Sequence, residues 1–99
     1  MITKSLEITT GIETLYGPRD ENLRLLEDGL QVNIDLRSDA VHVTGSADSV
    51  DRVAHIFSDY EQLRRGGVTL QNGELKGMLK LVIADPSVTL KSLVDSGKQ

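Results

Sequence analysis

Gly17, Pro18, Arg19 and Asp20 form the stretch best suited to binding a ligand, because they immediately precede leucines at helical spacing. A glycine lets the backbone approach a phosphate closely, and the N-terminus of a following helix presents free N–H groups and the positive end of the helix dipole. Arg19 adds a cation beside that position. The same residues also suit a plain helix start, with Pro18 in the first turn and Asp20 as the N-cap, and this second interpretation is the commoner one.

Other chemical groups in the chain form weaker patterns. Asp48, Asp51 and His55 share a helical face and have a spacing that could hold a metal, but the apolar stripe of that helix lies opposite, so we expect a solvated face. His42 alternates with valines and is expected at an exposed strand position. Residues 95–99 (DSGKQ) lack the first glycine and the hydroxyl residue of a phosphate-binding P-loop. With two isolated histidines and no cysteine, the chain has little material for a nucleophile–base pair or a thiolate metal site, and we expect no catalytic residue, metal or cofactor in it.

The composition limits how the chain could meet nucleic acid. Its 99 residues are enough for one domain, and 11 basic against 15 acidic residues give a net charge of −4. Any nucleic-acid binding therefore needs a local basic patch, for which Arg19, Arg24 and Arg37 are expected beside one groove. Three aromatic residues offer few platforms for stacking bases. No apolar run approaches the ~20 residues of a membrane helix, which predicts a cytoplasmic location without membrane contact.

Hydrophobic periodicity predicts an α/β fold of the α+β kind. Residues 5–9 alternate polar and apolar, so Leu6 and Ile8 are expected to point inward, and residues 12–16 suit one helical turn. The remaining predicted elements are a helix from Pro18 with Gly29 as its stop signal, strands at 32–37 and 40–44, a long helix capped by Ser46 and ended by Gly66 and Gly67, a weaker helix at 71–84, and a linker at 87–99 with a short helical stretch at 90–94. A three-stranded antiparallel sheet with helices on one face buries every apolar stripe.

The run 15–27 (LYGPRDENLRLLE), followed by strands 32–37 and 41–45 (VHVTG), resembles the amino-terminal region of the PhoH-like, phosphate-starvation-inducible P-loop ATPases. The element order likewise resembles a type I K-homology domain, βααββα, with an extra C-terminal helix. This resemblance implies a K-homology-like domain over residues 1–70, and over 71–99 an additional helix and linker toward an ATPase domain outside this chain. ATP and Mg²⁺ are expected only in that ATPase domain.

The resemblance also gives the turn at Gly17 a specific meaning. K-homology domains clamp the backbone of single-stranded nucleic acid with a Gly-x-x-Gly turn. Here Asp20 replaces the second glycine and puts a carboxylate where a phosphate would rest. As an N-cap, Asp20 would also occupy N–H groups that the phosphate needs. The resemblance therefore implies a K-homology-like fold whose nucleic-acid-binding turn has lost its second glycine.

Two functions follow from these expectations. The first is an accessory module of a PhoH-like ATPase that binds single-stranded RNA through Gly17, Arg19, Arg24 and Arg37. The alternative is a structural module of the same ATPase, which mediates homo-oligomer or other protein–protein contacts without binding RNA. A free-standing enzyme ranks last, and this chain is not expected to be one.

Overall fold

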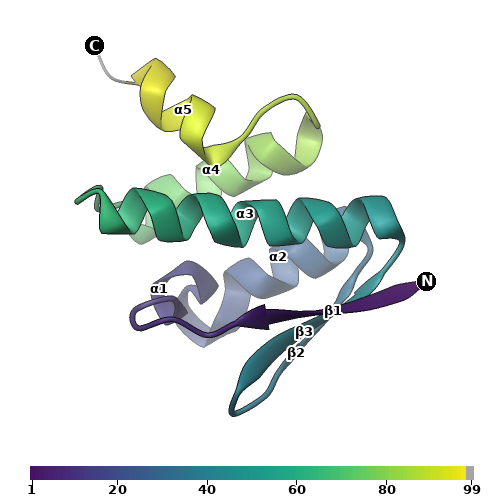
Figure 1. Ribbon diagram of the computed structural model, residues 1–99. Coiled ribbons are helices and arrows are strands. Elements are labelled where there is room, and N and C mark those ends of the chain that lie inside the picture. Colours follow the sequence, from purple (N-terminus) through teal and green to yellow (C-terminus); the bar gives the residue numbers. More distant parts are fainter. Residues whose placement is uncertain (98–99) are drawn as a thin grey trace.

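The computed structural model describes residues 1–97 and has the predicted α/β fold (Figure 1). Its elements in chain order are β1 (Ile2–Glu7), α1 (Glu13–Tyr16), the short 3-10 helix η1 (Pro18–Asp20), α2 (Glu21–Leu30), β2 (Asn33–Leu36), β3 (Ala40–Gly45), α3 (Ala47–Arg65), α4 (Asn72–Ala84) and α5 (Leu90–Gly97). This order confirms the βααββα layout, which α4 and α5 extend at the C-terminal end.

The sheet has three antiparallel strands in the order β1-β3-β2, with the helices on one side (Figure 1). Val41 and Val43 of the central strand are fully buried, as their alternation predicts. The prediction for the first strand was wrong at both ends. β1 pairs with β3 from Ile2 to Glu7, so Ile8 lies outside the strand and is 38% exposed. The pairing with β3 sets the two ends of β1, and local alternation does not reveal how far this pairing extends.

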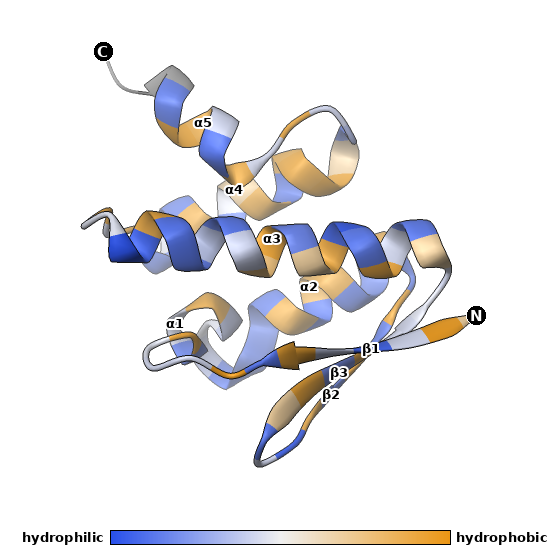
Figure 2. Cartoon of the chain, viewed as in Figure 1, coloured by the Kyte–Doolittle hydropathy of each residue, from blue (hydrophilic) through white to orange (hydrophobic). Residues whose placement is uncertain are grey.

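The long helix α3 forms as predicted. The Ser46 hydroxyl caps it by accepting a 3.2 Å hydrogen bond from the Ser49 N–H, and Val50, Val53 and Phe57 are buried. Figure 2 shows hydrophobic and hydrophilic segments alternating along α3, which is the pattern of a helix with one buried face.

The second helix ends later than predicted. α2 continues through Gly29 to Leu30, and Gln31 closes it in a left-handed conformation with φ 55°. Gly29 instead permits close packing against α4, because a Cβ added there would lie 2.6 Å from Cγ2 of Ile83. The prediction of Gly29 as a stop signal was therefore wrong, since helix–helix contact rather than helix termination accounts for this glycine.

The C-terminal helices pack onto the rest of the chain. The predicted helix at 71–84 is confirmed as α4, and α5 runs beyond the predicted short stretch to Gly97. Leu75, Leu79 and Leu90 belong to the same hydrophobic core as the sheet valines. Residues 98–99 of the predicted linker lie outside the described residues. Within residues 1–97, no helix is both long enough and apolar enough to cross a membrane.

Candidate nucleic-acid interface

The turn between α1 and α2 is built from an unusual backbone. Gly17, Arg19 and Asp20 all have positive φ, at 78°, 55° and 57°. The Asp20 N–H donates a 3.1 Å hydrogen bond to the Gly17 carbonyl, and the Glu21 N–H donates to the Pro18 carbonyl. Left-handed backbone is costly for residues with a side chain, so Arg19 and Asp20 are strained. Such strain gathers at functional sites, which makes this turn the first place to look for a ligand.

Asp20 does not cap α2, so this prediction was wrong. It occupies the N-cap position with φ 57° and ψ 27°, and its side chain makes no capping hydrogen bond. A capping side chain reaches the helix from an extended backbone, as Ser46 does with φ −66° and ψ 155°. The Asp20 carboxylate therefore occupies none of the N–H groups of α2, and one of the two expected obstacles to a phosphate is absent, although the Glu21 N–H is already bound to the Pro18 carbonyl.

Gly17 is required by the packing beneath the turn as well as by its φ angle. A Cβ added to Gly17 would lie 2.7 Å from Nδ2 of Asn22. The Asn22 side chain is fully buried, and its Nδ2 donates a 3.0 Å hydrogen bond to the Leu15 carbonyl. Asn22 thus ties the end of α1 to the first turn of α2 and holds the turn in position.

Two of the three predicted arginines lie at this turn. Arg19 is within it, and Arg24 is exposed on α2 about one helical turn after Asp20. Among residues 1–97, neither Arg19 nor Arg24 forms an ion pair. Both guanidinium groups are therefore available to an external anion.

Arg37 is separated from the other two. It forms an ion pair with Asp35, with 2.7 Å between Nε and Oδ2. Asp35 pairs with His42 in the sheet, and His42 alternates with the buried Val41 and Val43. Asp35 and its partner Arg37 therefore belong to the sheet face that is turned away from the helices. The structure does not bring Arg37 to the turn at Gly17.

A lysine that sequence reasoning missed lies beside the turn. Lys76 of α4 forms a 3.3 Å ion pair with Glu21, the first residue of α2. The N-terminal residue of α4, Asn72, also approaches the turn, with its Oδ1 3.2 Å from a Cβ placed on Gly17. No local pattern could reveal this, because it depends on how α4 docks against α2.

Acidic groups surround the same turn. The pKa of the Tyr16 hydroxyl is raised, first by burial and then by the negative charges of Glu13 and Asp20. The two carboxylates, rather than burial, give a negative field at the end of α1, and such a field opposes an anion. Arg19, Arg24 and Lys76 must therefore offset a local acidic background.

A carboxylate also occupies part of the space between α2 and β2. Oε2 of Glu27 accepts a 2.8 Å hydrogen bond from the Ile34 N–H. β2 pairs only with β3, so this N–H belongs to the free edge of the strand. Glu27 thereby occupies this backbone donor at the strand edge.

The other chemical candidates stay apart from the turn. Asp48, Asp51 and His55 are exposed on α3, as expected for a solvated face. Among residues 1–97, no three His, Cys, Asp or Glu side chains gather closely enough to hold a metal ion. His42 lies between Ser5 and Asp35 in the sheet register and is only partly exposed. The end of the P-loop-like segment, residues 98–99, lies outside the described residues.

The chain was compared with family models, curated proteins and solved structures. No family model, no curated protein and no solved structure matches this chain.

Proposed function

We propose that this chain is a K-homology-like accessory module that holds single-stranded RNA weakly for a PhoH-like ATPase. The RNA backbone would contact the turn from Gly17 to Asp20, with Arg19 and Arg24 as the phosphate partners. Arg37 is left out of this proposal because its guanidinium is bound to Asp35 on the opposite face of the sheet. The role is binding rather than catalysis, it is exercised in the cytoplasm, and ATP and Mg²⁺ would belong to the separate ATPase domain.

One observation carries the proposal. Arg19 in the turn and Arg24 in α2 form no ion pair among residues 1–97, and they lie at the start of a helix whose N-cap carboxylate does not bind the helix. Free N–H groups, the positive end of the dipole and nearby cations together favour a phosphate.

The same geometry limits the strength and selectivity of binding. Two arginine contacts supply a modest, salt-dependent affinity, and the acidic background of Glu13 and Asp20 lowers it further. Glu27 occupies the Ile34 N–H, so little of the β2 edge is left to read bases. We therefore expect weak binding with little base preference.

Fluorescence anisotropy with a short labelled single-stranded RNA tests this function. Affinity should fall as salt rises from about 50 to about 200 mM, and Arg19→Ala combined with Arg24→Ala should reduce the salt slope by about 1.4, or ~0.7 for each lost contact. Arg37→Ala is the control for each single variant, Arg19→Ala and Arg24→Ala, because it also removes one positive charge but from the far face of the sheet. Equal losses in the single variants and in the control would show that net charge alone accounts for binding.

A second candidate function is a structural module that packs against the ATPase or forms a homo-oligomer. The acidic groups that raise the pKa of Tyr16 favour it, because they disfavour a polyanion at the turn. Undetectable RNA binding together with concentration-dependent self-association in sedimentation would support this candidate over the first.

A further inference from the structure

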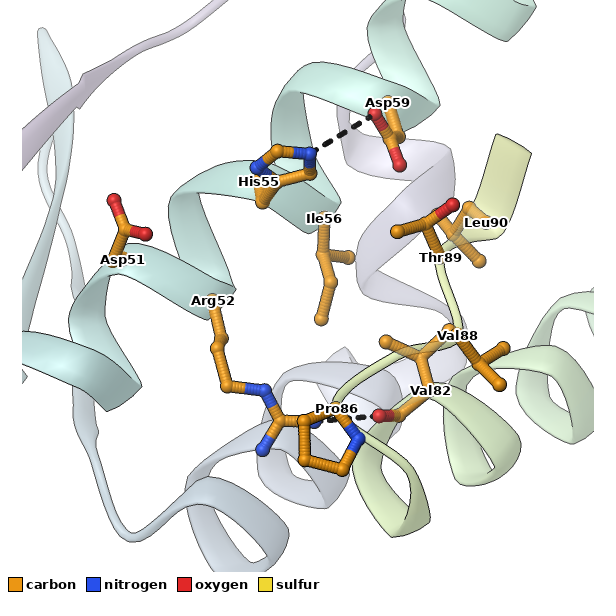
Figure 3. A pocket seen from close by; sticks show the side chains of 10 residues that line it. All are labelled: Asp51, Arg52, His55, Ile56, Asp59, Val82, Pro86, Val88, Thr89 and Leu90. Carbon is orange, nitrogen blue, oxygen red and sulfur yellow. Dashed lines mark hydrogen bonds and ion pairs between the residues drawn. The ribbon is translucent and has the colours of Figure 1, made fainter. Parts of the chain in front are cut away.

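A cavity lies on the side of α3 that faces α4 and α5, and it has no part in the proposed RNA contact. It opens between α3 and the segment that joins α4 to α5, with a volume of about 200 Å³ (Figure 3). Since a water molecule takes up ~30 Å³ of liquid, this space has room for a small organic group.

The floor of the cavity is apolar. Ile56 from α3, Val82 from α4, Val88 from the connecting segment and Leu90 from α5 all line it (Figure 3). Val82, Ile56 and Leu90 all belong to the buried hydrophobic core. These walls suit an aliphatic stem, whose transfer from water contributes ~0.8 kcal/mol for each buried methylene.

A carboxylate without a close partner lines one end of the cavity. The Asp59 side chain is only 7% exposed, and in the described part of the chain its sole ion-pair contact is with Nε2 of His55 at 4.0 Å. That separation is beyond hydrogen-bond range, and the imidazole itself is 66% exposed. Figure 3 shows the Asp59 carboxylate directed toward the connecting segment near Thr89. A buried charge in this state is costly unless a cation joins it.

The other end of the cavity carries positive charge. The Arg52 guanidinium donates a 2.6 Å hydrogen bond to the Val82 carbonyl at the end of α4 (Figure 3). The neighbouring carboxylate, Asp51, is exposed to solvent. Asp51 also lines the cavity, so this end carries a carboxylate as well as the guanidinium.

We propose that this cavity binds one primary alkylammonium group, with the ammonium on Asp59 and the aliphatic stem against Ile56, Val82 and Val88. The carboxylate of Asp59 and the apolar wall are both features of the cavity itself. The ammonium group has two chemical sources, a free alkylamine and a lysine side chain of another polypeptide. This site is independent of the RNA proposal, and failure of one leaves the other unaffected.

Methyl and amide NMR titrations of the wild-type chain with n-butylammonium test the site. We expect saturable shifts at Val82, Val88 and Leu90 with a dissociation constant in the millimolar range. The neutral isostere n-butanol should bind at least about tenfold more weakly, because it cannot pair with Asp59. Equal binding of butanol, or no shift in the cavity, would overturn the proposal without requiring any variant.

Two variants sharpen the test. Asp59→Asn removes the charge with little change in shape and should weaken butylammonium binding about tenfold, whereas Asp48→Asn removes an exposed charge from the same helix outside the cavity and should not. Asp59→Asn should also raise the thermal midpoint, since it relieves an unpaired buried charge. Unchanged affinity in Asp59→Asn would overturn the proposal, and so would a lowered midpoint, which would assign Asp59 a structural role.

A blocked lysine, Nα-acetyl-lysine methylamide, distinguishes the two sources. Shifts of similar size with the blocked lysine and with butylammonium would support a lysine side chain of a partner as the natural occupant. Shifts with butylammonium alone would support a free amine. A lack of binding by both would contradict the site itself.

Discussion

The side-chain amide of Asn22 donates a 3.0 Å hydrogen bond to the Leu15 carbonyl, and this bond joins α1 to α2 directly beneath Gly17. The turn that carries Arg19 is therefore held by a buried polar contact rather than by a capping carboxylate. Buried polar contacts of this kind specify one backbone arrangement, because leaving either group unpaired is costly.

Gly17→Ala should destabilise the fold by about 1–3 kcal/mol. The added Cβ would meet Asn22 Nδ2 at 2.7 Å, and φ 78° with ψ 174° is a conformation that L residues avoid. Urea unfolding followed by circular dichroism measures the change. An unchanged midpoint would contradict the packing described beneath the turn.

Gly77→Ala should change folding stability in the direction opposite to Gly17→Ala. Gly77 lies inside α4, and a Cβ added there has nothing within 4 Å. Alanine should therefore stabilise the helix by about 0.5–1 kcal/mol through its better helix propensity. The same urea experiment measures it, and a clear loss of stability would mean that α4 packs more tightly around this position than described.

Asp20→Gly should raise RNA affinity about fivefold. The change removes a carboxylate from the turn and suits the backbone there, where φ is 57°. In water, removing one repulsive charge about 4 Å from a phosphate accounts for ~1 kcal/mol. Asp39→Gly, in the exposed β2–β3 turn, is the control and should leave affinity unchanged. Reduced or equal affinity in Asp20→Gly would speak against a repulsive role for this carboxylate.

Glu61 should make folding stability depend on acidic pH. Its carboxylate accepts hydrogen bonds from the Thr9 hydroxyl at 2.5 Å, from Arg64 at 2.8 Å and from Arg65 at 3.0 Å. These bonds, that from Thr9 above all, hold the pKa of Glu61 below its usual range. A lowered folded-state pKa favours folding while the group is ionised, so this stability is fully present above the ordinary Glu pKa and is lost as pH falls through the folded value.

Glu61→Gln should therefore flatten the pH dependence of the unfolding midpoint on the acidic side. Glu7→Gln is the control, because Glu7 is exposed and forms no ion pair within residues 1–97. Thermal melts across the acidic range compare the two. Parallel curves for wild type and Glu61→Gln would show that the Thr9–Glu61 contact does not contribute as described.

Much of the fold could be predicted because local signals and burial agree. The alternation of Val41 and Val43 gives the inward face of the central strand, and Ser46 marks the start of α3. The alternation of Ile34 and Leu36 also predicts that Asp35 and Arg37 lie on the opposite side of β2. This pattern alone could have separated Arg37 from Arg19.

The rest depended on contacts that no local pattern encodes. Lys76 meets Glu21, and Gly29 meets Ile83, only because α4 docks along α2. Aspartate is favoured at N-cap positions, but the turn holds the Asp20 backbone in the left-handed region. From there its side chain makes no capping hydrogen bond. Tertiary packing overrode local preference at each of these positions.

The most direct test of the RNA account is an amide-resolved NMR titration of the chain with short single-stranded RNA at low salt. The account predicts that shifts concentrate on residues 17–24, including the amides of Asn22 and Leu23 in the first turn of α2, while His42 and Asp35 on the open sheet face stay unchanged. Shifts centred on the open sheet face, or none at any RNA concentration, would contradict it.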